Sequence, residues 1–231
     1  MNLQSCRLPY SRLYWDTRDP IKEEYLVEFR LLYEGELLSS GNRPKPENKH
    51  EIRRKLHPQL RNLWRTKSNL VQYAEHLGAS MPPHGGTKEE RIDRGIASLG
   101  FNYEKAGYRF VPLVTERFAL RCSVDMLILR PDESQIIHSD SSDLDGKVKT
   151  IFDALQIPKD LINAGGTGPQ PDETPFYCLL EDDKLISELH VTADQLLALP
   201  GQRSPKASDS FIVIHVKINH RGGGPFDRWF D

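Results

Sequence analysis

The stretch Asp143-Leu144-Asp145-Gly146-Lys147-Val148-Lys149, which continues into Phe152-Asp153-Ala154-Leu155, decides how this chain is interpreted. Its apolar residues recur at helical spacing and predict an amphipathic helix over residues 143–156. Ser142 or Asp143 is a suitable N-cap, so the helix is expected to begin near the first aspartate. Asp145, Lys149 and Asp153 then follow one another at four-residue intervals, about one turn apart, along one side of the helix.

This pattern favours a site that holds a divalent cation against a phosphate. Carboxylate oxygens are the hard ligands that Mg²⁺ prefers, and Asp182-Asp183, just before an apolar strand pattern, offers further carboxylates. Lys149 adds a cation for the same phosphodiester. The free N–H groups and the macrodipole at the helix start also favour an anion near Asp143.

A plainer interpretation of the same residues stays open. Aspartates at helix N-termini are common caps, and Asp145, Lys149 and Asp153 are equally consistent with solvated ion pairs. Asp182-Asp183 taken alone is typical of a turn. The metal-site hypothesis depends on the joint pattern, because each part alone has a structural explanation.

The joint pattern resembles the RusA family of Holliday junction resolvases. The residues that carry the resemblance are Asp143-Leu144-Asp145, Lys149, Phe152 to Leu155, and Asp182-Asp183 before Leu185-Ile186. The resemblance covers residues 117–218 or so, less than half of the chain. It implies that Asp143, Asp145 and Asp183 bind the catalytic metal, that Lys149 is needed for activity, and that the protein acts as a homodimer.

The chain departs from the family pattern in two places. Gly146 stands where the family usually has asparagine, and glycine lowers helix propensity by about 1 kcal/mol relative to alanine. A long insertion, Gln156 to Glu181, replaces a short connection. Surface insertions cost little closure entropy, so we expect this one to add a lid or a contact surface without breaking the site.

The net charge of −2 argues against a DNA-binding protein when taken alone, but the charges are unevenly distributed. Between Arg43 and Lys67 there are nine basic residues against Glu47 and Glu51. Such a basic stretch beside an acidic, metal-requiring site suits phosphodiester cleavage. The alternative is a solvated amphipathic helix with basic decoration. The residues expected to contact DNA are Arg43, Lys45, Arg53, Arg54, Lys55 and Lys147.

Composition and length indicate a globular protein with one main core. The 231 residues are 38% hydrophobic and 28% charged, and three widely spaced cysteines argue for reduced thiols in a cytoplasmic compartment. We find no secretory segment and no apolar run long enough to cross a bilayer, so no membrane partner is expected. The chain is expected to divide into three parts. Residues 1–100 form an N-terminal strand with a basic helical region, residues 101–220 form a RusA-like core with an insertion at 156–181, and residues 221–231 form a C-terminal tail.

Periodicity along the chain predicts an α+β fold, with a mixed sheet, packed helices and additions at the N-terminus and in a loop. The sheet is expected to combine the strands that contain Phe118, Leu185 and Phe211 with the N-terminal strand. Thr87 and Glu90 predict a capping box. The other expected elements are a strand at 25–38, a helix at 49–77 interrupted near Pro58, a hairpin of 108–115 with 117–130, and strands at 184–191 and 210–219.

The resemblance implies an endonuclease, dependent on Mg²⁺ with Mn²⁺ as a possible substitute, that cleaves branched DNA such as four-way junctions in recombination and repair. Under general metal chemistry the ion activates water and polarises the phosphate, while Lys149 stabilises the developing charge. Two alternatives stay open: a non-catalytic relative that binds DNA or acts as a scaffold, and a metal-dependent nuclease for another DNA structure. The distances among the carboxylates of Asp143, Asp145 and Asp183 distinguish these readings.

Overall fold

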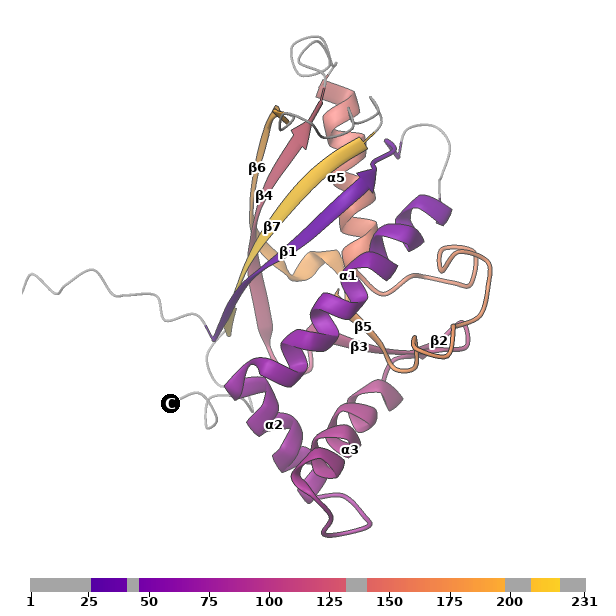
Figure 1. Cartoon of the computed structure of the whole chain (residues 1–231), viewed down its shortest axis with the longest axis vertical. Coiled ribbons are helices and arrows are strands. Elements are labelled where there is room, and N and C mark those ends of the chain that lie inside the picture. Colours follow the sequence, from indigo (N-terminus) through magenta and orange to yellow (C-terminus); the bar gives the residue numbers. More distant parts are fainter. Residues whose placement is uncertain (1–25, 41–45, 132–140, 198–208, 221–231) are drawn as a thin grey trace, which may run out of the picture.

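The computed structural model describes residues 26–40, 46–131, 141–197 and 209–220. For residues 141–143 and 220 it describes the backbone alone. It is an α+β fold with mixed sheets (Figure 1). None of its helices in these ranges is long and apolar enough to cross a membrane. The elements are β1 (Val27–Glu36), α1 (Pro46–Thr66), α2 (Ser68–Ala79), α3 (Lys88–Phe101), β2 (Glu104–Lys105), β3 (Tyr108–Val114), β4 (Leu120–Arg130), α5 (Ser141–Leu155), β5 (Phe176–Leu180), the 3-10 helix η1 (Asp183–Leu185), β6 (Ile186–Gln195) and β7 (Asp209–His220).

The main sheet has the strand order β1-β7-β4-β6, and it contains the strands that the sequence assigned to it. β7 pairs antiparallel with β1 and β4, whereas β6 runs parallel to β4. The expected alternation is confirmed, because every second residue of β7 from Ile212 to Ile218 is buried, as is every second residue of β4 from Leu120 to Arg130. One face of this sheet therefore lies on the core.

The predicted hairpin of β3 and β4 is wrong. β3 does not pair with β4. It belongs to a second sheet with the order β2-β3-β5, in which it runs parallel to β5. A turn between the two strands, closed by the bond from Leu120 N to Thr115 O (3.2 Å), redirects the chain. Nearly all of β3 is buried on both faces, so its partners come from the interior and not from the next strand along the chain.

The insertion contributes a strand to the core. All five residues of β5 are buried, and β5 continues the parallel pairing of the second sheet. A small cluster forms there from side chains that are distant in the sequence, namely Tyr108, Phe110, Ala164, Phe176 and Cys178. The end of the insertion therefore belongs to the core, whereas the sequence had suggested a lid or a contact surface for the insertion.

Helix α1 continues through Pro58, and the break lies instead at Lys67, between α1 and α2. The predicted interruption at Pro58 is wrong. Pro58 and Arg54, whose carbonyl loses its usual donor, both lie on the exposed side of the helix, where water can satisfy that carbonyl. The capping box at the start of α3 is confirmed: Thr87 Oγ1 accepts from Glu90 N at 3.2 Å, and Thr87 N donates to Glu90 Oε2 at 2.8 Å.

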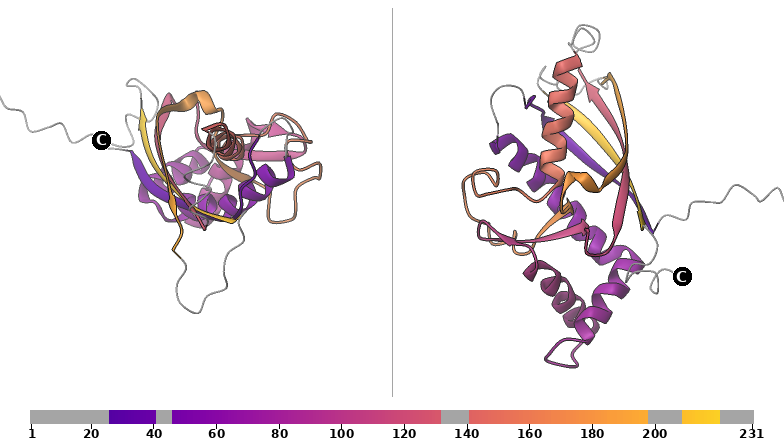
Figure 2. Two further views of the ribbon diagram at one scale, coloured as in Figure 1. Left: turned by 90° about the horizontal axis from the view of Figure 1, so that it is seen from above. Right: turned by 180° about the vertical axis from the view of Figure 1, so that it is seen from behind.

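The helices cover one face of the main sheet. Seen from behind, α5 lies lengthwise before the strands, and α1 crosses below it (Figure 2). Ile151, Ala154 and Leu155 of α5 are buried in the same cluster as side chains of β1, α1, β4 and β7, so this core combines residues from both 1–100 and 101–220. Residues 221–231, the expected tail, lie outside the described residues.

Candidate functional site

The signature helix begins at Ser141 and ends at Leu155, close to its expected limits. Asp145 and Lys149 are both exposed and lie four residues apart, which is one turn, on the same side of α5. The backbone of Asp143 lies in the first turn, while its side chain is outside the described part of the chain. The structure thus brings Asp145 and Lys149 together as expected at the start of the helix.

Gly146 packs closely against the segment that follows β1. A β-carbon at this position would lie 2.0 Å from Ser39 Oγ and 3.4 Å from Ser40 N, in the segment that follows β1. Ser40 N donates to Gly146 O (2.9 Å), and Thr150 Oγ1 donates to Leu38 O (2.8 Å). The missing side chain leaves room for the Ser39 hydroxyl, and the two hydrogen bonds attach the segment after β1 to the first turns of α5, which carry Asp145 and Lys149.

The Asp182-Asp183 pair forms the turn that leads from β5 into β6. Asp182 caps η1, since its Oδ1 accepts from Lys184 N at 3.0 Å. The side chain of Asp183 is exposed, and its backbone N–H donates to Gln156 Oε1 at 3.2 Å. Gln156 follows directly on α5, so the pair is attached to the C-terminal end of this helix.

The expected convergence of Asp143, Asp145 and Asp183 stays a prediction, because the side chain of Asp143 lies outside the described residues. Asp145 lies in the second turn of α5, and Asp183 is bound beyond its last turn, eleven residues further along. At 1.5 Å per residue the rise along α5 from Asp145 to Gln156, to which Asp183 is attached, is about 16 Å, much longer than the span of the ligands of one ion. Among the described side chains, which exclude that of Asp143, no group of three or more His, Cys, Asp or Glu residues is placed to hold a metal.

A polar network fixes the C-terminal end of α5 where the Asp183 turn is attached. Lys49 Nζ lies 2.5 Å from Asp153 Oδ2, and Gln156 Nε2 donates to Asp153 Oδ1 at 3.2 Å. From α1, Arg53 donates to three backbone carbonyls, those of Asp153 (2.6 Å), Asn163 (3.2 Å) and Gln156 (3.4 Å). A cation at the C-terminus of a helix also opposes the negative end of its macrodipole. Burial lowers the pKa of Arg53 to about 10, which leaves it charged at neutral pH.

Two histidines of α1, His50 and His57, lie on either side of Arg53 in the sequence, and both rings contact Phe176 of the small cluster around β5. Burial, followed by the charge of Arg53, lowers the pKa of His50 to about 4. Burial also lowers the pKa of His57, whose Nδ1 accepts from Tyr177 N (2.9 Å) while Nε2 faces Asp172 O (3.2 Å). A neutral ring protonated at Nε2 satisfies both contacts, so these histidines are structural.

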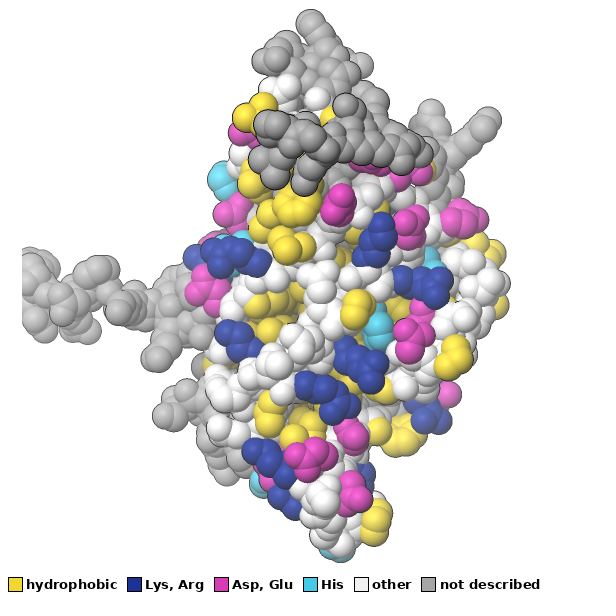
Figure 3. All heavy atoms as spheres, in the orientation of Figure 1, with side chains coloured by type: hydrophobic (Ala, Val, Ile, Leu, Met, Phe, Trp, Pro, Cys, Tyr) yellow, Lys and Arg dark blue, Asp and Glu magenta, His cyan; other side chains and the backbone are white. Residues whose placement is uncertain are grey.

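The basic stretch of α1 is largely engaged within the protein. Arg53 is 2% exposed, so it offers no guanidinium to DNA and that expectation is wrong. Arg54 pairs with Glu173 at 2.5 Å, and Lys55 donates to Glu34 O at 2.8 Å and lies 3.3 Å from Glu51. Lys147 is 9% exposed, whereas Arg43 and Lys45 lie outside the described residues. Basic and acidic side chains are interspersed on the face shown in Figure 3.

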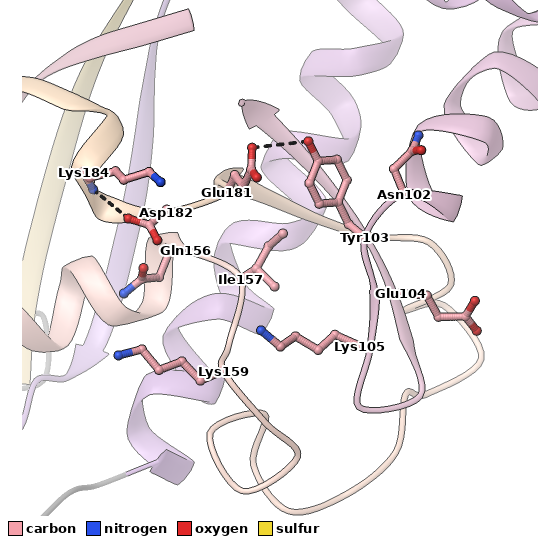
Figure 4. A pocket seen from close by; sticks show the side chains of 10 residues that line it. All are labelled: Asn102, Tyr103, Glu104, Lys105, Gln156, Ile157, Lys159, Glu181, Asp182 and Lys184. Carbon is pink, nitrogen blue, oxygen red and sulfur yellow. Dashed lines mark hydrogen bonds between the residues drawn. The ribbon is translucent and has the colours of Figure 1, made fainter. Parts of the chain in front are cut away.

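A cavity of about 430 Å³ opens beside the Asp182-Asp183 turn. Glu181 lies on its wall, where its Oε2 accepts from Glu116 N (2.9 Å) and from Tyr103 Oη (3.3 Å). Burial, followed by the charge of Glu181, raises the pKa of Tyr103 to about 12. Figure 4 shows the side chains that line it: Asn102, Tyr103, Glu104, Lys105, Gln156, Ile157, Lys159, Glu181, Asp182 and Lys184.

Sequence reasoning missed this cavity, because its walls come from β2, from the start of the insertion and from the turn after β5. One signal was present: Gln156 directly follows the Phe-Asp-Ala-Leu motif. No family model, no curated protein and no solved structure matches this chain. The resemblance to the RusA resolvases therefore rests on the motif residues and their placement.

Proposed function

We propose that this protein is a divalent-cation-dependent endonuclease that cleaves branched DNA, with four-way junctions as its substrate. The observation that carries the proposal is the presentation of Asp145 and Lys149. Both are exposed on one side of a helix whose opposite side is buried in the core, and Gly146 fixes the turn that bears them. A carboxylate and an ammonium held one turn apart suit a cation and the phosphate that it binds.

The donor set fits Mg²⁺ or Mn²⁺. The carboxylate of Asp145 has no hydrogen bond or ion pair within the described part of the chain, so it is available as a ligand, and we assign Asp143 beside it to the same ion. When bound, the cation would activate a water molecule and polarise the scissile phosphate. Lys149 would place its ammonium near the non-bridging oxygens and stabilise the charge that develops there.

Asp183 completes the site only from a second copy of the chain. A twofold axis across the middle of α5 would pair this helix with its symmetry mate in antiparallel orientation. The start of one helix, with Asp145, would then lie beside the end of the other, with Asp183. In Figure 2 (right), no other element of the described ranges lies before α5. Its residues Leu144, Val148 and Phe152 pack against the core and are only partly buried. Two equivalent sites would follow, as symmetric cutting of a junction requires.

The test is cleavage of a synthetic four-way junction in Mg²⁺. Asp145→Asn should abolish cleavage and keep or strengthen junction binding, because a charge that repels phosphate has been removed. Lys149→Ala should lose cleavage but keep Mn²⁺ binding, since its role is on the phosphate. Glu188→Gln, which removes an exposed carboxylate from β6, is the matched control and should cleave normally.

A second candidate function is a RusA-like protein that binds branched DNA without cutting it. The attachment of Asp183 at the C-terminal end of α5, eleven residues beyond Asp145 along the helix, favours it. Wild-type protein that binds junctions and leaves them intact in both Mg²⁺ and Mn²⁺ would support this binding role and reject the nuclease. Cleavage of flaps or other branched structures in preference to four-way junctions would keep the nuclease and change its substrate.

A further inference from the structure

The cavity beside Asp182-Asp183 has a charge arrangement that the proposed nuclease site does not use. Lys105 reaches into it from β2, and Lys159 from the segment after α5 (Figure 4). Both lysines are exposed, and within the described residues neither makes a hydrogen bond or an ion pair. Lys184 differs from them, because its Nζ lies 3.1 Å from Glu116 Oε1.

The carboxylates around the cavity make no hydrogen bond or ion pair with these two lysines within the described residues. Asp160, whose charge acts on Lys105, already accepts two hydrogen bonds from Asn163. Glu181 is held by Tyr103 Oη and Glu116 N, and Asp182 accepts from Lys184 N. Glu104 extends away from the other carboxylates in Figure 4. Two ammonium groups thus face a hollow whose acidic neighbours already accept hydrogen bonds from the protein. Such a hollow suits an anion that brings its own oxygen acceptors.

The cavity also adjoins Asp183, which we assign to the metal site. Gln156 lines it and accepts from the backbone N–H of Asp183 at 3.2 Å. A volume of about 430 Å³ is within the range of pockets that hold small ligands, so it can admit one nucleotide. Arg53 is buried, and Arg54 and Lys55 already pair with acidic side chains, whereas Lys105 and Lys159 have no such pairing within the described residues.

We propose that this cavity binds two backbone phosphates of the cut DNA strand, next to the scissile phosphate, with Lys105 as the donor to one and Lys159 as the donor to the other. The inference rests on the proposed function and adds the path of the DNA to it. The strand would pass from the ion, held by Asp145 of one copy and the acidic turn of the other, into the cavity beside that turn. There each lysine would neutralise one phosphate and release its counterions.

The experiment measures binding of a labelled four-way junction between about 50 and 200 mM salt, with Ca²⁺ replacing Mg²⁺ to prevent cleavage. Lys105→Ala combined with Lys159→Ala should weaken binding severalfold at low salt. It should also reduce the slope of log K against log salt by about 1 to 2, since each phosphate contact contributes about 0.9. The matched control, Lys67→Ala combined with Lys88→Ala, removes two exposed lysines elsewhere and should leave the slope unchanged.

An unchanged slope in the Lys105/Lys159 pair, an equal change in the control pair, or no junction binding by the wild type would overturn the phosphate site. These results are separable from a failure of the proposed nuclease. A wild type that never cuts but shows the predicted slope change keeps the cavity proposal and loses the nuclease. One that cuts normally and shows no slope change loses only the cavity.

Discussion

Arg53 illustrates how a single residue can mislead when charge alone is considered. It lies in a basic stretch, yet it is also seven residues before Leu60 and three before Leu56, on the stripe of α1 that faces the core. Its position on this stripe, and not its charge, indicates that it is buried. The side chain joins the end of α5 to the insertion through backbone carbonyls, a contact that no local pattern reveals.

The stability of the fold should depend on pH through His50. Its pKa of about 4 lies below the ordinary value of 6.5, so between these pH values the unfolded chain binds a proton that the folded protein does not. The contribution of His50 to the free energy of unfolding is therefore complete above pH 6.5 and is lost as the pH falls toward 4. The upper limit of this loss is about 3 kcal/mol.

Urea unfolding of the wild type, His50→Gln and His84→Gln at pH 7 and pH 5 measures this contribution. His50→Gln should lose less stability between the two pH values than the wild type does, because the buried imidazole is gone. His84→Gln replaces an exposed histidine in the loop before α3 and should follow the wild type. Equal losses in all three proteins would mean that His50 does not carry the effect.

At the scale of elements, α2 and α3 cross with their backbones in contact. A β-carbon on Gly95 would lie 1.9 Å from Ala74 O, and one on Gly78 would lie 1.7 Å from Arg91 O. Glycine is unfavourable within a helix, so these two residues are present for the close approach and not for helix formation. The crossing depends on both positions.

Gly95→Ala should therefore lower the free energy of unfolding by about 2 kcal/mol or more, since overpacking outweighs the gain of about 1 kcal/mol in helix propensity. Gly100→Ala, in the same helix, is the matched control. Its β-carbon would meet side chains at 3.5 Å, an ordinary contact, so its stability should stay level or rise slightly. Chemical denaturation measures both. A Gly95→Ala protein as stable as Gly100→Ala would contradict the close crossing.

Sequence periodicity located single elements better than their partners. The strands of the main sheet and helix α5 were predicted because each is amphipathic, and amphipathic spacing is a local property. The pairing of β3 with β5 was not predicted, because β3 is buried on both faces and its neighbour lies more than sixty residues further along the chain. Periodicity has no means to choose a distant partner for a strand that is apolar on both sides.

For the whole molecule, the same limit applies to the candidate site. The motif placed Asp145 and Lys149 on one side of a helix, which the fold confirms. The position of Asp183 depended on the path of a 26-residue insertion, Gln156 to Glu181, which the sequence leaves open. That path ends beside the C-terminal end of α5, so the structure separates acids that the motif alone suggested would meet.

Mixing two inactive proteins tests whether the site is shared between copies. Asp145→Asn and Asp183→Asn should each abolish junction cleavage. Co-expressed, half of a random population of twofold dimers would contain one of each, and such a dimer has one intact site, so about one quarter of the sites would recover. The recovered activity should nick one strand without a paired second cut. A mixture as inactive as its components would exclude a site shared in this way.

The pairing of β1 with β7 has a consequence for the protein as it is made. Val27 pairs with Ile218, and Glu36 with Asp209, so the first described strand has its neighbour in the last one. At ribosomal speeds of about 5–20 residues per second, β1 waits on the order of tens of seconds before that neighbour emerges. During this time its apolar side and its unpaired edge are exposed to other nascent chains. Early synthesis is therefore when this protein is most vulnerable to aggregation, and when a chaperone bound to β1 would protect it most.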